Sequence, residues 1–245
     1  MTENSILGVD AGAAIRERLH AVQARIAEAA TRARRDPKAV TLIAVSKTHP
    51  VETLRRAFDA GAVAFGENRV QEAVAKVHAI GRAPEWHLIG ELQTKKAKQA
   101  VASFDVIHSL DRLVLGRALS THAVAMGKQC RALVQVNVAG KESQGGVAPD
   151  GLEALVRELA VLPAISLDGL MCIAPEASED VGVDGVRRAF QSLAIQWRKL
   201  ADLTHDHGHP WHHLSMGMTG DFELAIEEGA TMVRIGRAIF GDRSI

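Results

Sequence analysis

The sequence predicts an α/β protein of one domain, a closed (β/α)8 barrel of the TIM type with an extra N-terminal helix. Three observations lead to this prediction. Short apolar segments alternate with helix-like segments along the chain. Each apolar segment is nearly continuous, which is typical of parallel strands covered on both faces. There are eight such segments, the number that closes this kind of barrel. No Pro/Gly/Ser-rich linker divides the chain, so we expect one domain over 1–245 with a flexible tail over 1–10.

The predicted elements follow in chain order. The segment 13–35 is an amphipathic helix, with Ile15, Leu19, Val22 and Ile26 at helical spacing. The expected strands are 40–45, 62–65, 86–89, 106–108, 132–136, 167–171, 212–214 and 232–235. The expected helices between them are 51–60, 67–80, 94–102, 113–126, 151–162, 186–203 and 221–228. A doubly wound open sheet would also alternate, but the glycine fingerprint that follows its first strand is absent here.

Composition narrows the class of partner. The 29 basic residues equal the 29 acidic ones, so no overall field favours nucleic acid or an acidic membrane. The N-terminus lacks the pattern of a signal peptide and no stretch is long and apolar enough to span a membrane, which predicts a cytoplasmic protein. Cys130 and Cys172 form no metal or redox motif, and we expect buried thiols. A small-molecule ligand is favoured.

Lys47 directly follows the apolar run of the first strand, at the end of a barrel where active sites form. Partial burial there would lower the pKa of the ammonium group, and a neutral amine can form a Schiff base. A lysine at a strand end can also simply extend its head to solvent, and the position alone does not decide between the two.

Two further segments predict a phosphate site. The loop 213–221 brings glycines and the hydroxyls of Ser215 and Thr219 to a helix start, although Thr219 or Asp221 could merely cap that helix. The segment 234–241 places a glycine and a short helical turn after the eighth strand, where barrels often hold phosphate. A lysine and a phosphate cradle across one mouth suit an aldehyde cofactor with a phosphate handle.

These motifs, taken in order, resemble those of a known family. The segments AVSKT (44–48), FGEN (65–68), WHLIG (86–90) with LQ (92–93), GLM (169–171), LSMGM (214–218) and RIGRAIFG (234–241) resemble the YggS/PROSC family of pyridoxal phosphate homeostasis proteins, over about 40–241. The resemblance implies a barrel like the N-terminal domain of alanine racemase, with pyridoxal 5′-phosphate (PLP) on Lys47. It further implies that Asn68 lies near the ring, that Met218 forms a wall of the site, and that Arg234 is directed toward the pyridine nitrogen. The phosphate contacts it implies are Ser215, Thr219, Gly236 and Arg237.

The sequence departs from the family pattern at three positions. Arg69 stands where an aromatic residue is frequent, Thr219 where serine is usual, and Lys95 where asparagine often follows the Leu-Gln pair. Thr219 keeps the hydroxyl, while Arg69 and Lys95 add positive charge near the mouth. These differences leave the path of ligand entry undecided. They do not affect the expected Schiff base.

The alternative to a PLP carrier is a PLP-dependent racemase or decarboxylase. Related enzymes carry an additional β domain and work as dimers, and we expect no such domain here and a monomer. The chain also contains no tyrosine, so a racemase scheme with tyrosine as the second base is excluded. An arginine at the pyridine nitrogen would discourage its protonation and weaken the ring as an electron sink. The sequence therefore predicts a protein that is not an enzyme, that holds PLP and related B6 vitamers, and that passes PLP to apoenzymes.

Two other classes of protein, a metal-binding protein and an interaction protein, fit the sequence less well. The tract 205–213 holds five of the eleven histidines, but its spacing matches no zinc pattern and a hydrophilic loop is favoured, so no metal is expected. An interaction protein without a cofactor would leave Lys47 and the phosphate loops unexplained.

Overall fold

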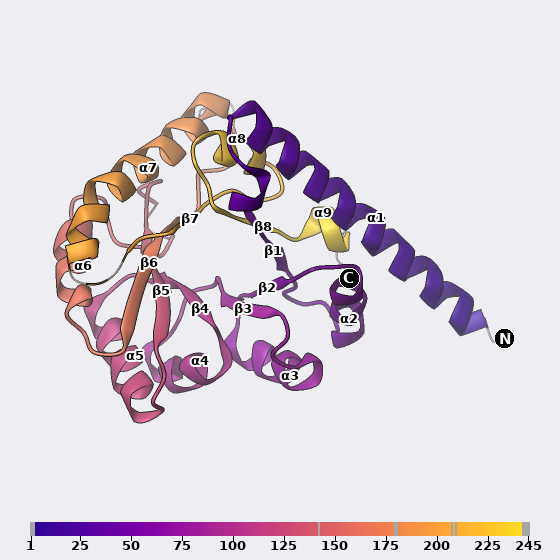
Figure 1. Ribbon diagram of the computed structural model, residues 1–245, viewed down its shortest axis with the longest axis horizontal. Coiled ribbons are helices and arrows are strands. Elements are labelled where there is room, and N and C mark those ends of the chain that lie inside the picture. Colours follow the sequence, from indigo (N-terminus) through magenta and orange to yellow (C-terminus); the bar gives the residue numbers. More distant parts are fainter. Residues whose placement is uncertain (1–2, 142, 179–180, 207, 209, 242–245) are drawn as a thin grey trace.

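The strands form a closed parallel barrel, as the sequence predicts (Figure 1). The computed structural model describes residues 3–141, 143–178, 181–206, 208 and 210–241, with the backbone alone for 3–11 and 202–206. Each strand pairs with the next in chain order, and β8 closes the barrel onto β1. The strands are β1 (Thr41–Val45), β2 (Ala64–Glu67), β3 (Glu85–Leu88), β4 (Val106–Leu110), β5 (Cys130–Val136), β6 (Ile165–Cys172), β7 (His213–Ser215) and β8 (Met232–Ile235).

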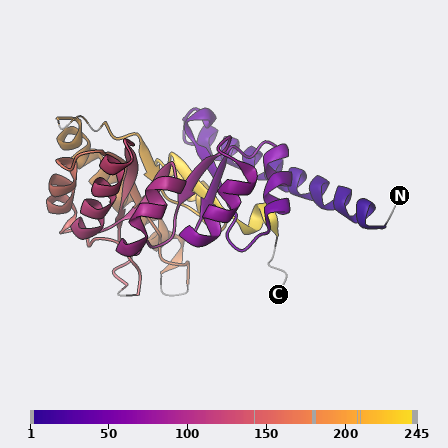
Figure 2. The same cartoon turned by 90° about the horizontal axis from the view of Figure 1, so that it is seen from below.

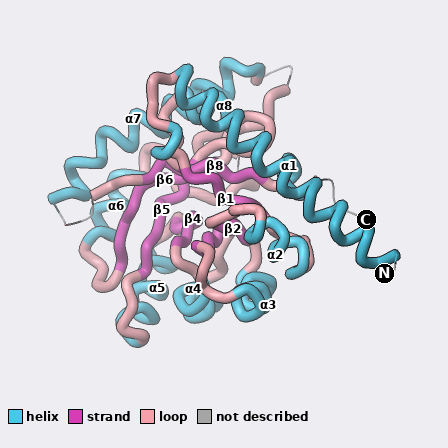
Figure 3. Tube along the Cα trace, turned by 45° about the vertical axis from the view of Figure 1, so that its right-hand side comes forward, coloured by secondary structure: helices cyan, strands magenta, loops and turns pink. Residues whose placement is uncertain are grey.

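Helices surround the barrel, with the strands at the centre (Figure 3). Among the described residues they are α1 (Glu3–Arg32), η1 (Pro37–Ala39), α2 (Val51–Asp59), α3 (Val70–Ile80), η2 (Thr94–Lys96), α4 (Ala97–Ser103), α5 (Leu113–Ala125), α6 (Leu152–Ala160), α7 (Gly182–Asp206), α8 (Phe222–Glu227) and α9 (Arg237–Phe240). Within this part of the chain, no helix combines the length and apolarity needed to cross a membrane.

The extra N-terminal helix α1 packs across α8, α9 and α2 on the outside of the barrel. The apolar side chains predicted for this helix are buried between it and the barrel, and Leu19 is fully buried. The helix begins at Glu3, whereas the sequence predicts a tail over 1–10 and a helix start at Ala13. Gly8 and Gly12 lower the helix propensity of this segment, which is why the pattern did not extend the helix. In Figure 2 the N-terminal part of α1 projects past the barrel.

The barrel separates two kinds of buried surface. Side chains that face outward join the large core beneath the helices. Inside the barrel the apolar part is a small separate cluster, formed by Ile43, Ala64, Val106, Leu133, Met171 and Met232. Polar side chains occupy much of the remaining interior, among them His87, His108, Ser215 and Arg234, all of which are buried. The interior is thus unusually polar for a packed barrel, and this shapes the site described next.

The two cysteines, Cys130 and Cys172, are buried free thiols, as expected. Burial raises the pKa of each thiol to about 12, so neither forms a thiolate at neutral pH.

Candidate cofactor site at the carboxyl ends of the strands

The residues that the sequence singles out lie at the carboxyl ends of four neighbouring strands. β1 pairs with both β2 and β8, and β8 also pairs with β7. The loops that follow these four strands therefore share one sector of the barrel mouth. They place Lys47 after β1, Asn68 after β2, Ser215 in β7 followed by Met218 and Thr219, and Arg234 in β8 followed by Gly236 and Arg237.

Lys47 lies in a tight turn that directly follows β1, and its side chain is half-buried. The N–H of Ser46 donates to the carbonyl of Gly66 in β2 at 3.0 Å, and the N–H of His49 donates back to the Ser46 carbonyl at 3.1 Å. Thr48 has a φ of +69°, a left-handed conformation that β-branched residues rarely adopt. The surrounding structure must hold this turn in place, because the conformation is unfavourable by itself.

Charged side chains from β2 and α3 hold the Lys47 turn in place. Lys76 Nζ donates to the Ser46 carbonyl at 2.7 Å, to Glu67 Oε1 at 2.8 Å and to Glu72 Oε1 at 2.6 Å. Glu72 Oε1 also accepts the backbone N–H of the residue after Lys47. The backbone on both sides of Lys47 is therefore bound to one group of charges. We call Lys76, Glu67 and Glu72 the Lys76 cluster.

Glu67 and Lys76 of this cluster are almost completely buried, at 0% and 4% exposure. Burial raises the pKa of the Glu67 carboxyl, and it outweighs the hydrogen bonds from Lys76 and Ser46, which lower it. Glu67 Oε2 has no hydrogen-bond partner among the described residues. Removing these two charges from water costs free energy. We therefore expect the pair to position the Lys47 turn as well as to stabilise the fold.

Arg234 faces the same mouth from β8, where it lies opposite Ile43 of β1. Its side chain is buried, and its guanidinium is held from below: Nη1 donates to Ser215 Oγ at 2.7 Å and Nη2 donates to the Cys172 carbonyl at 2.7 Å. Burial lowers the pKa of the guanidinium. Ser215 Oγ also contacts His108 Nδ1 at 3.0 Å, so the hydroxyl lies within the interior polar group. The predicted contact of Ser215 with a phosphate stays a prediction.

The loop after β7 is pinned by its own residues. The N–H of Met218 donates to Asp221 Oδ1 at 2.6 Å, so this side chain fastens the loop and does not cap α8. Gly217 has a φ of +92°, and a Cβ there would approach the Cα of Phe222 to 2.9 Å, which only glycine avoids. Thr219 is half-buried and Met218 is exposed beside it.

The loop after β8 packs closely on the end of β1. A Cβ at Gly236 would come within 3.2 Å of the Val45 carbonyl oxygen, so a small residue is needed where the two strand ends meet. Arg237, the next residue, is exposed. Asn68 is half-buried beside this sector. An amine, an anchored guanidinium and two adjoining loops thus converge on one mouth, and this donor set fits a phosphate-bearing aldehyde cofactor.

Comparison with known proteins places the chain in a class of barrel and then in a family. The family model described as alanine racemase, N-terminal domain, matches residues 18–244. A curated relative from Aquifex aeolicus, named pyridoxal phosphate homeostasis protein, is 42% identical over 231 residues, covering 93% of this chain and 97% of its own. A relative of the same name from Pseudomonas aeruginosa is 43% identical over 230 residues, covering 94% and 96%. The solved structure of PipY from Synechococcus elongatus, with PLP bound, is 36% identical with a TM-score of 0.78 and covers 93% of this chain and all of that one.

The chain belongs to the family of pyridoxal phosphate homeostasis proteins, whose barrel is that of the alanine racemase N-terminal domain. The resemblance noted in the sequence is therefore confirmed, and so is the fold.

Several residues of the site were not found from sequence. The sequence pattern assigns no role to Lys76 or His108, and it includes Glu67 and His87 only within the FGEN and WHLIG motifs. A signal did exist for His87: in β3, polar Glu85 and His87 alternate with apolar Trp86 and Leu88. No comparable signal marks Lys76, which has the sequence context of an ordinary exposed helix lysine. The histidine tract 205–213 lies partly outside the described residues, since His207 and His209 are not described.

Proposed function

We propose that this chain binds PLP covalently through Lys47 and acts as a carrier of the cofactor. The observation that carries the proposal is the placement of Lys47 and Arg234 on adjacent strands at one mouth, each held by its own polar network. The family membership and the PLP-bound structure of PipY support the identity of the cofactor.

The proposed bond is a reversible Schiff base. The neutral amine of Lys47 adds to the aldehyde carbon, a C=N bond forms, and one water leaves; hydrolysis reverses the step. This addition uses the neutral form of the amine. The firmly held turn keeps the amine at the mouth, so little ordering is required on binding.

The remaining residues would orient the cofactor. Arg234 has only N–H donors, so it would donate to the pyridine nitrogen and keep that nitrogen unprotonated. Thr219, Gly236 and Arg237 would surround the phosphate, Ser215 would orient Arg234 from below, Asn68 would lie near the ring, and Met218 would form a wall of the site. PLP bound in this way supplies an electrophilic aldehyde but a weak electron sink.

We propose storage and delivery of PLP rather than turnover of a substrate. The chain contains no tyrosine, and its curated relatives are named for homeostasis. The protein would keep free aldehyde low and release PLP to apoenzymes that need it.

Covalent binding is tested by adding PLP to the purified protein, reducing it with borohydride and mapping the modified peptide. We expect a yellow protein whose reduced adduct lies on Lys47. The Lys47→Ala variant should lose both the absorption band and the adduct, while Lys95→Ala, a control near the mouth, should keep them. Wild-type protein that stays colourless, or an adduct on other lysines alone, would refute the proposal.

Delivery is tested with an apo-transaminase and a phosphatase that destroys free PLP. Direct transfer predicts that the loaded protein restores transaminase activity despite the phosphatase, while free PLP at the same concentration does not. Equal suppression of both would show release into solution. Robust turnover on a panel of amino acids would overturn the carrier role.

A further inference from the structure

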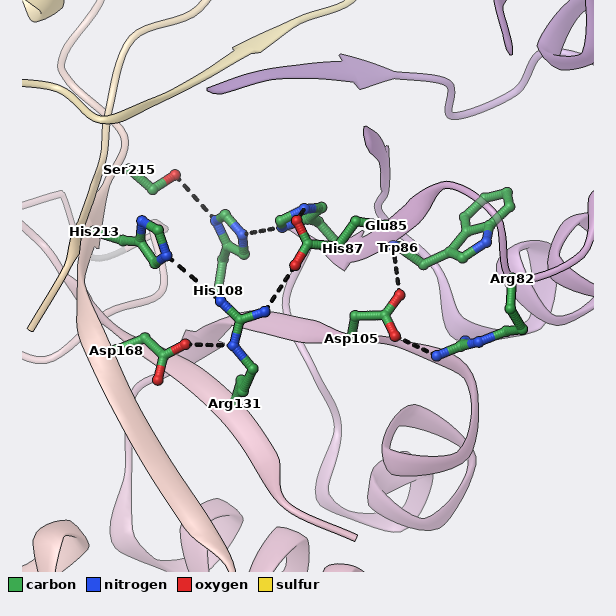
Figure 4. Close-up of polar contacts among 10 residues, drawn as sticks. All are labelled: Arg82, Glu85, Trp86, His87, Asp105, His108, Arg131, Asp168, His213 and Ser215. Carbon is green, nitrogen blue, oxygen red and sulfur yellow. Dashed lines mark hydrogen bonds and ion pairs between the residues drawn. The ribbon is translucent and has the colours of Figure 1, made fainter. Parts of the chain in front are cut away.

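A chain of hydrogen bonds that begins at Arg234 crosses the barrel interior, and Figure 4 shows its members Ser215, His108, His87 and Glu85. Arg234 Nη1 contacts Ser215 Oγ at 2.7 Å, and Ser215 Oγ contacts His108 Nδ1 at 3.0 Å. His108 Nε2 contacts His87 Nδ1 at 2.9 Å, and His87 Nε2 contacts Glu85 Oε2 at 3.1 Å. The links come from β8, β7, β4 and β3, and both histidines and the serine are fully buried. We call these five side chains the interior relay.

Each of the two end groups of the relay fixes the direction of the hydrogen bond that it makes. Arg234 can only donate, so Ser215 Oγ accepts from it. Glu85 lies between His87 and Arg131, and the hydrogen bond from His87, with further help from Arg131, lowers the pKa of its carboxyl to about 2. An ionised carboxylate only accepts, so His87 Nε2 carries a proton.

The protons between the two ends complete the proposed direction. Burial lowers the pKa of His108 well below its usual value, so this ring is neutral. The His87 proton lies on Nε2, and in the proposed direction its Nδ1 accepts from His108 Nε2. His108 Nδ1 then accepts the hydroxyl proton of Ser215. Each group donates to the next, from the guanidinium cation to the carboxylate.

The relay joins opposite ends of the barrel. Arg234 lies near the carboxyl end of β8, whereas Glu85 is the first residue of β3. Glu85 and Arg131 line a cavity of about 570 Å³ on that far side, together with Arg82, Asp105, Lys128 and Gln129. Arg131 Nε also donates to Asp168 Oδ2 at 2.6 Å, which fixes the charge pair at this end. The far end is therefore anchored by ions, while the middle of the relay is fully buried.

We propose that the interior relay positions Arg234 for the cofactor, with His108, His87 and Glu85 as positioning residues that act through Ser215. A polarised chain of hydrogen bonds makes the Ser215 oxygen a stronger acceptor, and it holds the guanidinium in one orientation. The part that concerns PLP rests on the proposed function, whereas the protonation pattern of the relay does not.

The protonation pattern is tested without cofactor, by long-range ¹H–¹⁵N NMR of protein labelled with ¹⁵N-histidine. His87 and His108 are assigned from the loss of their signals in single variants. At pH 7 both rings should carry the proton on Nε2 and show Nδ1 unprotonated. A proton on Nδ1 of either ring would overturn the inference, because the donors would then run in another direction.

The coupling to Arg234 is tested with Glu85→Gln, which keeps the shape of the side chain but removes the charge at the far end. We expect the His108 signals to change, and PLP to dissociate roughly threefold to tenfold faster, as for the weakening of about one hydrogen bond. The matched control is Ser109→Ala, since this buried β4 hydroxyl has no hydrogen-bond partner among the described residues. It should leave both measurements unchanged.

The outcomes separate the two ideas. A Glu85→Gln variant that loses thermal stability but keeps wild-type His108 signals and PLP dissociation would reduce the relay to a structural feature and refute the positioning role. If wild-type protein takes up no PLP, the proposed function fails, and the NMR result alone decides whether the relay exists as described.

Discussion

Replacing Lys76 with methionine should be among the most destabilising single changes in this protein. Methionine matches the length of the lysine stem but leaves Glu67 as a buried carboxylate without its cation. Lys76 is 4% exposed and makes three hydrogen bonds, to the Ser46 carbonyl and to two carboxylates. Breaking a buried ion pair on one side costs about 3–5 kcal/mol of unfolding free energy. The double variant Glu67→Gln/Lys76→Met removes both charges, so we expect it to recover part of this loss, leaving a deficit of about 1–3 kcal/mol.

The measurement is urea unfolding of the cofactor-free proteins at pH 7.5, followed by far-ultraviolet circular dichroism. Three variants are compared with the wild type: Lys76→Met, Glu67→Gln and the double variant. Lys98→Met, a change at an exposed lysine, serves as the control. It should change the free energy of unfolding by less than about 0.5 kcal/mol. A Lys76→Met variant that loses less than 1 kcal/mol, or a double variant no more stable than Lys76→Met, would refute the buried-charge explanation.

The effect should also depend on pH in a defined direction. Burial already raises the pKa of Glu67 in the folded protein, and without Lys76 nothing nearby lowers it as strongly. A carboxyl with a raised folded pKa takes up a proton more readily when folded, so folding gains stability as the pH falls through the window between the folded and unfolded pKa values. The deficit of Lys76→Met should therefore be smaller near pH 5 than near pH 8.

Two further predictions concern β6 and the far end of the barrel. Gly169→Ala should prevent normal folding or lower the unfolding free energy by more than about 3 kcal/mol, because a Cβ there would lie 1.8 Å from the His213 carbonyl oxygen; Gly61→Ala also has a positive φ but meets no atom within 4 Å, so it should cost only about 1 kcal/mol. Thermal unfolding distinguishes them, and equal losses would contradict the steric argument. Glu85→Gln should lower stability at pH 7 by about 1–2 kcal/mol, a value discounted for partial exposure, because the hydrogen bond from His87 lowers the pKa of Glu85 to about 2. This difference from wild type should disappear as the pH falls from about 4.5 towards 2, and urea unfolding that shows a constant difference would count against it.

The barrel was predictable from sequence because each strand is an apolar run between helices. The limits of individual strands were less certain. Residues Ala62 and Val63 are apolar but precede β2, which begins at Ala64 and ends on the buried carboxylate of Glu67. β4 continues through Ser109 to Leu110, past the polar pair at which the predicted strand ended. Glu67 points outward to Lys76 of α3, and the polar residues His108 and Ser109 lie within β4, so hydrophobicity does not mark the end of either strand.

The site residues are predicted by a rule that relates sequence to position, namely that catalytic and binding groups follow barrel strands. The rule says nothing about what holds those groups. Ser215 and His108 are 107 residues apart, and Lys76 reaches Ser46 across 30 residues. Such contacts depend on which strands become neighbours and on the exact radial direction of each side chain. A single sequence supplies neither.

Alternation within a strand does contain part of the missing information. In a barrel covered by helices, outward side chains pack against apolar helix faces, so a polar residue in a strand is accommodated at lower cost inside the barrel. Trp86 and Leu88 join the core beneath the helices, and Figure 4 shows Trp86 directed away from His87. Glu85 and His87 therefore had to point inward, where a buried histidine requires partners. Those partners are His108, Ser215 and finally Arg234, so the same requirement that each interior polar group be paired leads from β3 to the cofactor mouth. The polar interior of this barrel is thus continuous with its proposed binding site.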